Sequence, residues 1–214
     1  MDDTTTAPLS GRKAQAARND QRILDSARAV FLADPEAPIA AVAEHAGVGI
    51  SALYRRYRSK EELLQRLAGD GLRDYLAAVE AALADEGEPW AAFATFMRRC
   101  LDAGTSSLTA RLAGSFTATE EMNRDGRRSF ELTQRLLDRT KAAGALRPEI
   151  EVGDLSLLFE QLQAVNAGEG AERRQQLRRR YLALVLAALR APAAGEPLPG
   201  PPPTWAEISG RYNR

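Results

Sequence analysis

The stretch from Val42 to Leu64, VAEHAGVGISALYRRYRSKEELL, decides the fold of the N-terminal part of the chain. It begins inside a short amphipathic helix, whose apolar residues recur at the spacing of one helical face: Ile39, Val42, Ala43 and Ala46. Gly47 follows directly, and glycine tolerates the left-handed conformation in which helices commonly end. A second short helix and the start of a third complete the stretch, so its spacing predicts a helix-turn-helix.

The second helix of this stretch divides into an inward and an outward face. Leu53 and Tyr57 lie four residues apart and can face inward together. The other faces then carry polar, aromatic and basic side chains: Ser51, Tyr54, Arg55 and Arg58. Such a face fits a helix that enters a DNA groove.

The third helix begins at a recognisable cap. Ser59 and Glu62 form a Ser-x-x-Glu capping box before two leucines. Lys60 lies beside the free N–H groups of this helix start, and a helix N-terminus beside a lysine favours phosphate.

A further helix precedes the stretch. Apolar residues keep helical spacing at Ile23, Ala27, Val30 and Phe31, and a proline-containing break over 34–38 ends the pattern. The unit over about 18–58 is therefore predicted to be a three-helix DNA-binding module. A generic helical miniature domain, or a helix-turn-helix reused for protein contacts, is the alternative.

These residues resemble the TetR family of bacterial transcription regulators. The resembling elements are Ile23 to Ala27, Ala46-Gly47-Val48, Leu53 to Tyr57 and Ser59 to Leu63, and the resemblance covers residues 18–67. It implies DNA contacts from Tyr54 and Lys60, with Ser51, Arg55 and Arg56 near DNA. Together with the outward-facing Arg58, the predicted DNA-binding residues are Ser51, Tyr54, Arg55, Arg56, Arg58 and Lys60. The chain departs from the family pattern at Ala40, Gly49 and Ala52, where hydroxyl-bearing or small polar residues are usual.

Charge and cysteine content agree with a DNA-binding regulator of the cytoplasm. The net charge of the 214 residues is zero, but residues 10–60 carry nine Lys and Arg against five Asp and Glu. The positive charge is therefore concentrated at the motif. One cysteine excludes an internal disulfide framework, and the N-terminus does not read as a signal peptide. The longest apolar run, residues 181–189, is too short to span a membrane.

Helical patterns continue through the rest of the chain, which predicts an all-α fold. One long helix continues from the capping box to a break at 87–89, where Pro89 starts a helix that contains Trp90 and Leu101. Further helices are expected over 108–118, 120–143, 152–166 and 171–190. We divide the chain into a disordered N-terminal arm over 1–17, a helix-turn-helix domain over 18–62, a helical effector-binding and dimerisation domain over 63–190, and a Pro-rich tail over 191–214. The arm could alternatively be a basic segment that reaches a minor groove.

The second domain carries aromatic and sulfur-bearing side chains on neighbouring segments. Taken singly each is ordinary core, but the family resemblance implies a cavity for a small, lipophilic effector. The residues we assign to this site are Trp90, Phe93, Met97, Cys100, Phe116, Met122, Phe130, Phe159 and Gln163.

The last two helices each carry an apolar stripe. The resemblance implies that these helices pair across a twofold axis, which suits a palindromic operator. We assign to this surface Leu155, Leu158, Leu162, Tyr181, Leu184 and Val185. Packing within the chain alone is the alternative.

An enzyme is disfavoured by the residue inventory. The one histidine, His45, lies inside the helix-turn-helix. The chain has no second histidine that could activate the thiol of Cys100 as a nucleophile. The sequence carries no phosphate-binding glycine loop and no Cys/His metal cluster, so we expect no metal and no cofactor. The sequence therefore predicts a homodimeric, ligand-responsive repressor. A helical adaptor protein or an effector-independent regulator is the alternative.

Overall fold

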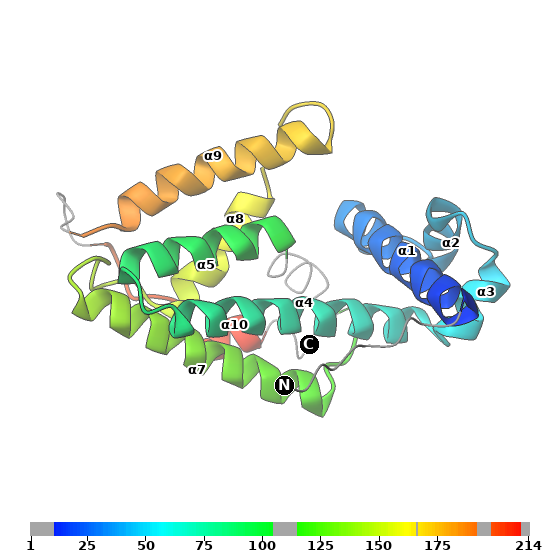
Figure 1. The fold of residues 1–214 in the computed structure, drawn as a ribbon, viewed down its shortest axis with the longest axis horizontal. Coiled ribbons are helices and arrows are strands. Elements are labelled where there is room, and N and C mark those ends of the chain that lie inside the picture. The colour runs from blue at the N-terminus through cyan, green and yellow to red at the C-terminus, as the bar shows by residue number, and fades with distance from the viewer. Residues whose placement is uncertain (1–10, 105–114, 166, 192–197, 211–214) are drawn as a thin grey trace, which may run out of the picture. The chain divides into compact units, whose positions relative to one another are not determined.

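The computed structural model describes residues 11–104, 115–165, 167–191 and 198–210, and within these ranges every regular element is a helix (Figure 1). This confirms the predicted all-α class. The chain separates into two compact units, residues 1–67 and residues 68–214. The boundary lies five residues beyond the predicted one, since the first turns of the long helix belong to the first unit.

The first unit contains α1 (Gly11–Ala33), α2 (Ile39–Ala46), α3 (Ile50–Arg56) and the start of α4 (Lys60–Ala84). Helix α1 packs on α2, and α2 packs on α3. The side chains of Phe31, Val42 and Leu53 are fully buried between these helices. Their burial follows the helical spacing of the sequence, which confirms the predicted inward faces.

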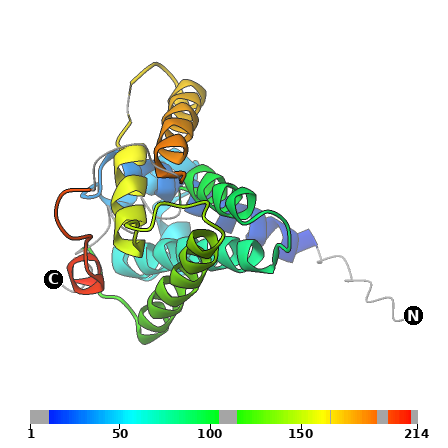
Figure 2. The same ribbon diagram turned by 90° about the vertical axis from the view of Figure 1, so that its left-hand side faces the viewer.

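The second unit contains the rest of α4, α5 (Pro89–Ala103), α7 (Glu120–Ala142), α8 (Val152–Gln163), α9 (Ala171–Leu189) and α10 (Trp205–Ser209). Helix α5 contacts α7, α8 and α9, so it lies at the centre of this unit (Figures 1 and 2). Its core includes Phe93, Phe96 and Phe159, whose rings are buried. The predicted break at 87–89 is confirmed, because α5 begins at Pro89 and the Glu88 side chain caps it by accepting from the N–H groups of Trp90 and Ala91.

Two predicted segments need correction. Residues 108–114 of the predicted helix over 108–118 lie outside the described residues, and residues 115–118 are not helical. Thr119 is the N-cap of α7: its backbone is extended, and its hydroxyl accepts a hydrogen bond from the N–H of Met122 at 3.2 Å. Residues 11–17, predicted as part of a disordered arm over 1–17, belong to α1, which begins at Gly11. In the Pro-rich tail predicted over 191–214, Thr204 and Glu207 form a capping box that begins α10. This Thr-x-x-Glu pattern was readable in the sequence.

Helix α10 packs on α8 (Figure 2). Ile208 is buried, and the ring centroid of Trp205 lies 5.0 Å from that of Phe130 on α7. Gly153 on α8 faces the tail so closely that a Cβ atom there would lie 2.1 Å from the carbonyl oxygen of Pro203. Only glycine at position 153 allows this approach.

Among the described residues, none of the helices is long and apolar enough to cross a membrane.

Candidate nucleic-acid interface and the C-terminal unit

The turn between α2 and α3 has the geometry that the helix-turn-helix prediction requires. Gly47 ends α2 with φ 63° and ψ 36°, in the left-handed region that favours glycine. The N–H of Gly47 donates to Glu44 O at 3.0 Å, and the N–H of Val48 donates to Ala43 O at 3.0 Å. Arg22 on α1 also donates from Nη2 to Ala46 O at 2.7 Å, which fixes the end of α2 on α1.

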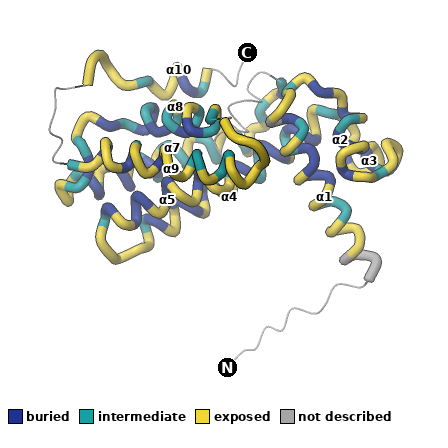
Figure 3. The backbone as a smooth tube through the Cα atoms, turned by 90° about the horizontal axis from the view of Figure 1, so that it is seen from above, coloured by how far each residue is buried: buried dark blue, intermediate teal, exposed yellow. Residues whose placement is uncertain are grey.

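Helix α3 presents most of its residues to the surface (yellow in Figure 3). Tyr54 is 47% exposed, although it is a large aromatic side chain. Ser51, Arg55 and Arg58 are exposed as well, and within the described part of the chain neither arginine side chain has a carboxylate partner. An exposed tyrosine flanked by free guanidinium groups can bind phosphate and base edges.

Arg56 differs from its neighbours because it is bound within the unit. Its Nε and Nη2 atoms lie 2.7 and 2.8 Å from the two carboxylate oxygens of Asp20 on α1. The hydroxyl of the buried Tyr57 donates to the same carboxylate at 2.7 Å. The hydrogen bonds from Arg56 hold the pKa of the Asp20 carboxyl below its ordinary value, and the Asp20 carboxylate raises the pKa of Arg56. Burial, followed by the bond to Asp20, raises the pKa of Tyr57.

Lys60 is also engaged inside the unit. Its Nζ donates to Pro35 O at 3.0 Å and lies 5.3 Å from the ring centroid of Phe31. The predicted helix start is confirmed, because the N–H of Glu62 donates to Ser59 Oγ at 3.0 Å. The Glu62 carboxylate accepts from the N–H of Arg58 at 2.6 Å. The assignment of Lys60 to a phosphate stays a prediction, and this lysine is half-buried.

Most residues assigned to the effector site lie in the core of the second unit. Trp90, Phe93, Met97, Cys100, Phe116 and Phe159 are buried, and Met122 and Phe130 are half-buried. The half-buried Gln163 donates from Nε2 to Leu101 O at 3.1 Å, which joins the end of α8 to α5. Five of the assigned residues, Trp90, Phe93, Met97, Cys100 and Phe159, belong to one hydrophobic cluster of buried residues, and Phe130 packs against it.

Sequence reasoning missed a polar pair in this core. The Tyr75 hydroxyl on α4 and Thr133 Oγ1 on α7 lie 2.9 Å apart, and Thr133 donates to Ser129 O at 2.7 Å. Burial raises the pKa of Tyr75, so its hydroxyl stays protonated. The two residues are 58 positions apart and share no motif that could have paired them.

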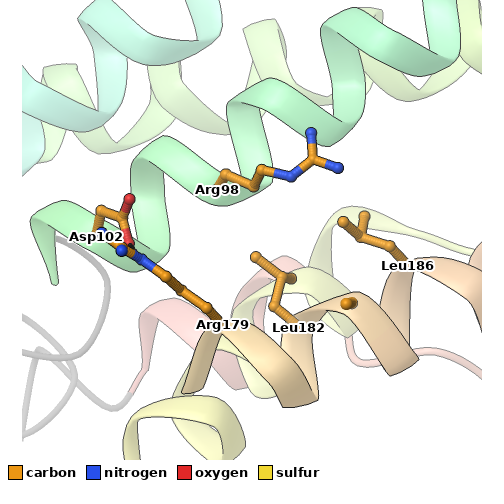
Figure 4. A pocket seen from close by; sticks show the side chains of 6 residues that line it. Arg98, Asp102, Arg179, Leu182 and Leu186 are labelled. Atoms are coloured by element: carbon orange, nitrogen blue, oxygen red, sulfur yellow. Dashed lines mark hydrogen bonds and ion pairs between the residues drawn. The ribbon is translucent and has the colours of Figure 1, made fainter. Parts of the chain in front are cut away.

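A pocket of about 210 Å³ lies between α5 and α9 (Figure 4). It is lined by Arg98, Asp102, Arg179, Leu182, Ala183 and Leu186. Asp102 accepts from Arg179 Nε at 2.9 Å and from Gln175 Nε2 at 2.8 Å, which lowers the pKa of its carboxyl. None of the predicted effector residues lines this pocket. Its volume is also below the roughly 300–1,000 Å³ of ordinary ligand sites.

The residues assigned to dimerisation fall into two groups. Leu155 and Leu162 are buried in the core of the second unit, because the face of α8 that carries them turns toward it. This places them inside the chain and off the predicted surface. Leu158 and Val185 are half-buried, whereas Tyr181 and Leu184 are 48% and 57% exposed. Leu157 on α8, which was not assigned, is 37% exposed.

The helix-turn-helix unit and the helical second unit together define a DNA-binding transcription regulator. Residues 23–67 match the family model of bacterial regulatory proteins of the TetR family, and residues 88–191 match the model of the C-terminal domain of SbtR-like transcriptional regulators. The chain belongs to the TetR family of transcriptional regulators, as its sequence motifs predicted. This family consists of regulators and not of enzymes.

Solved structures of the family share the fold. A TetR transcriptional regulator of Streptomyces coelicolor, SCO0520, is 26% identical over 82% of this chain and 99% of its own, with a TM-score of 0.51. A TetR regulatory protein of Mycobacterium vanbaalenii is 25% identical over 84% and 99%, with a TM-score of 0.53. LfrR of Mycobacterium smegmatis, in complex with proflavine, is 23% identical over 79% and 96%, with a TM-score of 0.56. No curated protein matches the chain significantly.

Proposed function

We propose that this regulator is a homodimeric repressor that binds a palindromic operator and is released by a small lipophilic effector. The observation that carries the proposal is an exposed apolar face on α8 and α9, in a chain whose helix-turn-helix has one exposed recognition helix. One such helix reads one half-site, and a twofold dimer reads two half-sites about 34–36 Å apart.

The apolar face is defined by Leu157 on α8 and by Tyr181 and Leu184 on α9. Single exposed apolar residues are ordinary, but these three lie on two helices that pack together. Leu177 and Ala188 extend the face of α9 at the same helical spacing. A self-complementary apolar face of this kind fits a second copy across a twofold axis.

Leu184→Glu tests the dimer. We expect sedimentation equilibrium to give a dimer for the wild type and a monomer for the variant at the same micromolar concentration, because a carboxylate would be buried in the interface. Leu198→Glu, the same change at another exposed leucine, is the control and should leave the dimer intact. A monomeric wild type, or a dimer unaffected by the glutamate at position 184, contradicts the assigned face.

The operator is found by selection from fragmented genomic DNA with the purified protein, repeated over a salt series. The proposal expects one palindromic motif near a promoter and a binding constant that falls with salt. Tyr54→Ala should weaken this binding and leave the dimer unchanged. Recovery of fragments without a shared motif would remove the repressor function and favour a helical adaptor protein.

The effector part of the proposal concerns the buried core of the second unit. Phe93 and Met97 are fully buried on α5, so an effector that binds against them would change how α5 packs. Helix α4 links this unit to the DNA-binding unit, and a shift in α4 would change the operator affinity. LfrR of Mycobacterium smegmatis, which shares the fold, was solved in complex with proflavine.

A panel of lipophilic small molecules tests this part by thermal stabilisation and by release from the selected duplex. Linkage requires that a true effector weakens operator binding by the same factor by which the operator weakens effector binding. A compound that stabilises the protein without this reciprocity is not the effector. If no compound of the panel has either effect, the regulator is effector-independent.

A further inference from the structure

The basic residues around α3 differ in whether their charge is available to DNA. Arg55 and Arg58 are exposed and have no carboxylate partner within the described residues. Arg56 lies between them in sequence, and its guanidinium bonds both oxygens of Asp20. Of these three arginines, two therefore carry a charge that is available to DNA, and the charge of the third is neutralised by Asp20 on α1.

The Asp20 carboxylate is less exposed to water than the guanidinium that it binds. Its side chain is 15% exposed, against 59% for Arg56. A bidentate pair is the strong form of the ion pair between a guanidinium and a carboxylate. Both of its hydrogen bonds would break if the Arg56 side chain turned to a phosphate. Among the described residues, Asp20 would then keep the Tyr57 hydroxyl as its hydrogen-bond donor, with the positive charge of Arg66 as a weaker influence. Leaving a partly buried carboxylate short of donors is costly, so the pair opposes a role for Arg56 in DNA contact.

The same carboxylate holds the end of α3. Residues 50–56 form a helix of two turns, which is too short to be stable by itself. Arg56 is its last residue and Tyr57 its C-cap, and both donate to Asp20. Because two consecutive residues donate to one carboxylate, both the position of this helix end and its rotation about the helix axis are fixed. Tyr54 and Arg55 lie within one turn of it.

We propose that Asp20 is a positioning residue for the recognition helix, and that Arg56 serves this contact and does not bind a phosphate. The proposal rests on the DNA-binding role of α3 proposed above. Asp20 sets the orientation in which Tyr54 and Arg55 meet the groove. The exposed guanidinium groups of Arg55 and Arg58 supply the charge.

Binding of two duplexes over a salt series tests the proposal. One duplex is the most enriched fragment from the genomic selection, and the other is a 30-base-pair duplex of mixed sequence. Asp20→Asn should reduce affinity for the enriched duplex about tenfold, since the helix is misplaced. It should leave the mixed duplex bound at least as tightly as before, since that binding depends on charge and the variant no longer neutralises Arg56. Equal loss on both duplexes would mean a general loss of folded protein and would overturn the proposal.

Arginine variants separate positioning from phosphate contact. Arg56→Lys keeps the charge but loses the planar fork, so it should behave like Asp20→Asn. Arg55→Gln, the neighbouring control, should lower the slope of log affinity against log salt by about 0.9, the value for one phosphate contact. If Arg56→Lys binds the enriched duplex like the wild type and Arg56→Gln loses the same slope as Arg55→Gln, Arg56 is a phosphate contact and the proposal is wrong.

Amide hydrogen exchange in the free protein gives a readout that needs no DNA. Asp20→Asn should speed exchange of the α3 amides about tenfold and leave the α2 amides unchanged. Asp25→Asn, the same change on α1 at an exposed aspartate bonded to Gln21, is the matched control and should leave α3 unchanged. Unchanged α3 exchange in Asp20→Asn overturns the proposal. A wild type without sequence preference would instead remove the proposed repressor function, and the exchange experiment would still decide whether Asp20 holds α3.

Discussion

The two units of this protein each contain an aspartate that accepts from an arginine and from a second donor, but the two aspartates lie in different surroundings. Asp20 in the first unit is 15% exposed and binds Arg56 through both oxygens. Asp102 in the second unit is 42% exposed and uses one oxygen for Arg179 and Gln175. Exposed ion pairs with one hydrogen bond contribute little to stability, whereas less exposed, bidentate ion pairs contribute more.

The difference follows from what else holds each unit together. The second unit has a large aromatic core, and α5 and α9 also meet through buried leucines such as Leu182 and Leu186. The surface ion pair between Asp102 and Arg179 therefore adds to apolar contacts that already join α5 and α9. In the first unit, α3 contributes one fully buried side chain, Leu53. A helix with so small an apolar anchor depends on polar bonds at its end.

The largest effect is expected from the core of the second unit. Phe93→Ala should lower the free energy of unfolding by about 3–5 kcal/mol, because it removes a fully buried ring. Both tryptophans of the chain, Trp90 and Trp205, lie in this unit, so denaturant unfolding followed by tryptophan fluorescence reports on it. Thr95→Ala on the exposed side of α5 is the control and should stay within about 0.5 kcal/mol of the wild type. A small loss for Phe93→Ala would mean that the site tolerates a cavity, as an effector pocket does.

The second-largest effect is expected at the Asp20 cluster, which consists of Asp20, Arg56 and Tyr57. Tyr57→Phe removes one hydrogen bond to a partly buried carboxylate and should lower the stability of the end of α3 by about 1.5 kcal/mol, measured by amide exchange. Tyr54→Phe removes the hydroxyl of an exposed tyrosine on the same helix and should leave exchange unchanged. Equal behaviour of the two variants would show that the Asp20 cluster does not stabilise α3.

Acid should weaken the same cluster. The pKa of Asp20 is lower in the folded protein than the ordinary value of about 3.9. The stabilisation is therefore fully present above the unfolded pKa and is lost as pH falls below about 4 toward the folded pKa. Exchange of the α3 amides, corrected for the intrinsic effect of pH, should accelerate in this window for the wild type. In Asp20→Asn this acceleration should be absent, and its persistence would assign it to another group.

The smallest effect is expected at the exposed pair. Asp102→Asn should not change the unfolding midpoint measurably, since its partner Arg179 is well exposed and the apolar contacts between α5 and α9 remain. The same fluorescence measurement checks it. A loss as large as that of Phe93→Ala would reverse the comparison between the two units.

Sequence patterns predicted the helices of the first unit because apolar spacing and capping signals are local. The turn at Gly47 and the start at Ser59 were predicted and are present, as is the start of α5 at Pro89. Side-chain partners over long separations were not predictable. Asp20 and Arg56 are 36 positions apart, and nothing in either segment marks the other as its partner. The family resemblance therefore placed Arg56 near DNA, with no sign of its bond to Asp20.

The apolar stripes of the second unit show the same limit. Periodicity identifies an apolar face of α8, but it cannot decide whether that face meets the core or a second copy. Leu155 and Leu162 proved to lie in the core, while Leu157, Tyr181 and Leu184 remain exposed.

The sequence by itself determined the all-α class, the helix-turn-helix and the family, because these depend on short-range spacing and on residue types at fixed offsets. Only the tertiary structure decided which charged and apolar side chains face inward. That choice depends on which helices come together, and helix packing brings together residues that lie far apart in the chain.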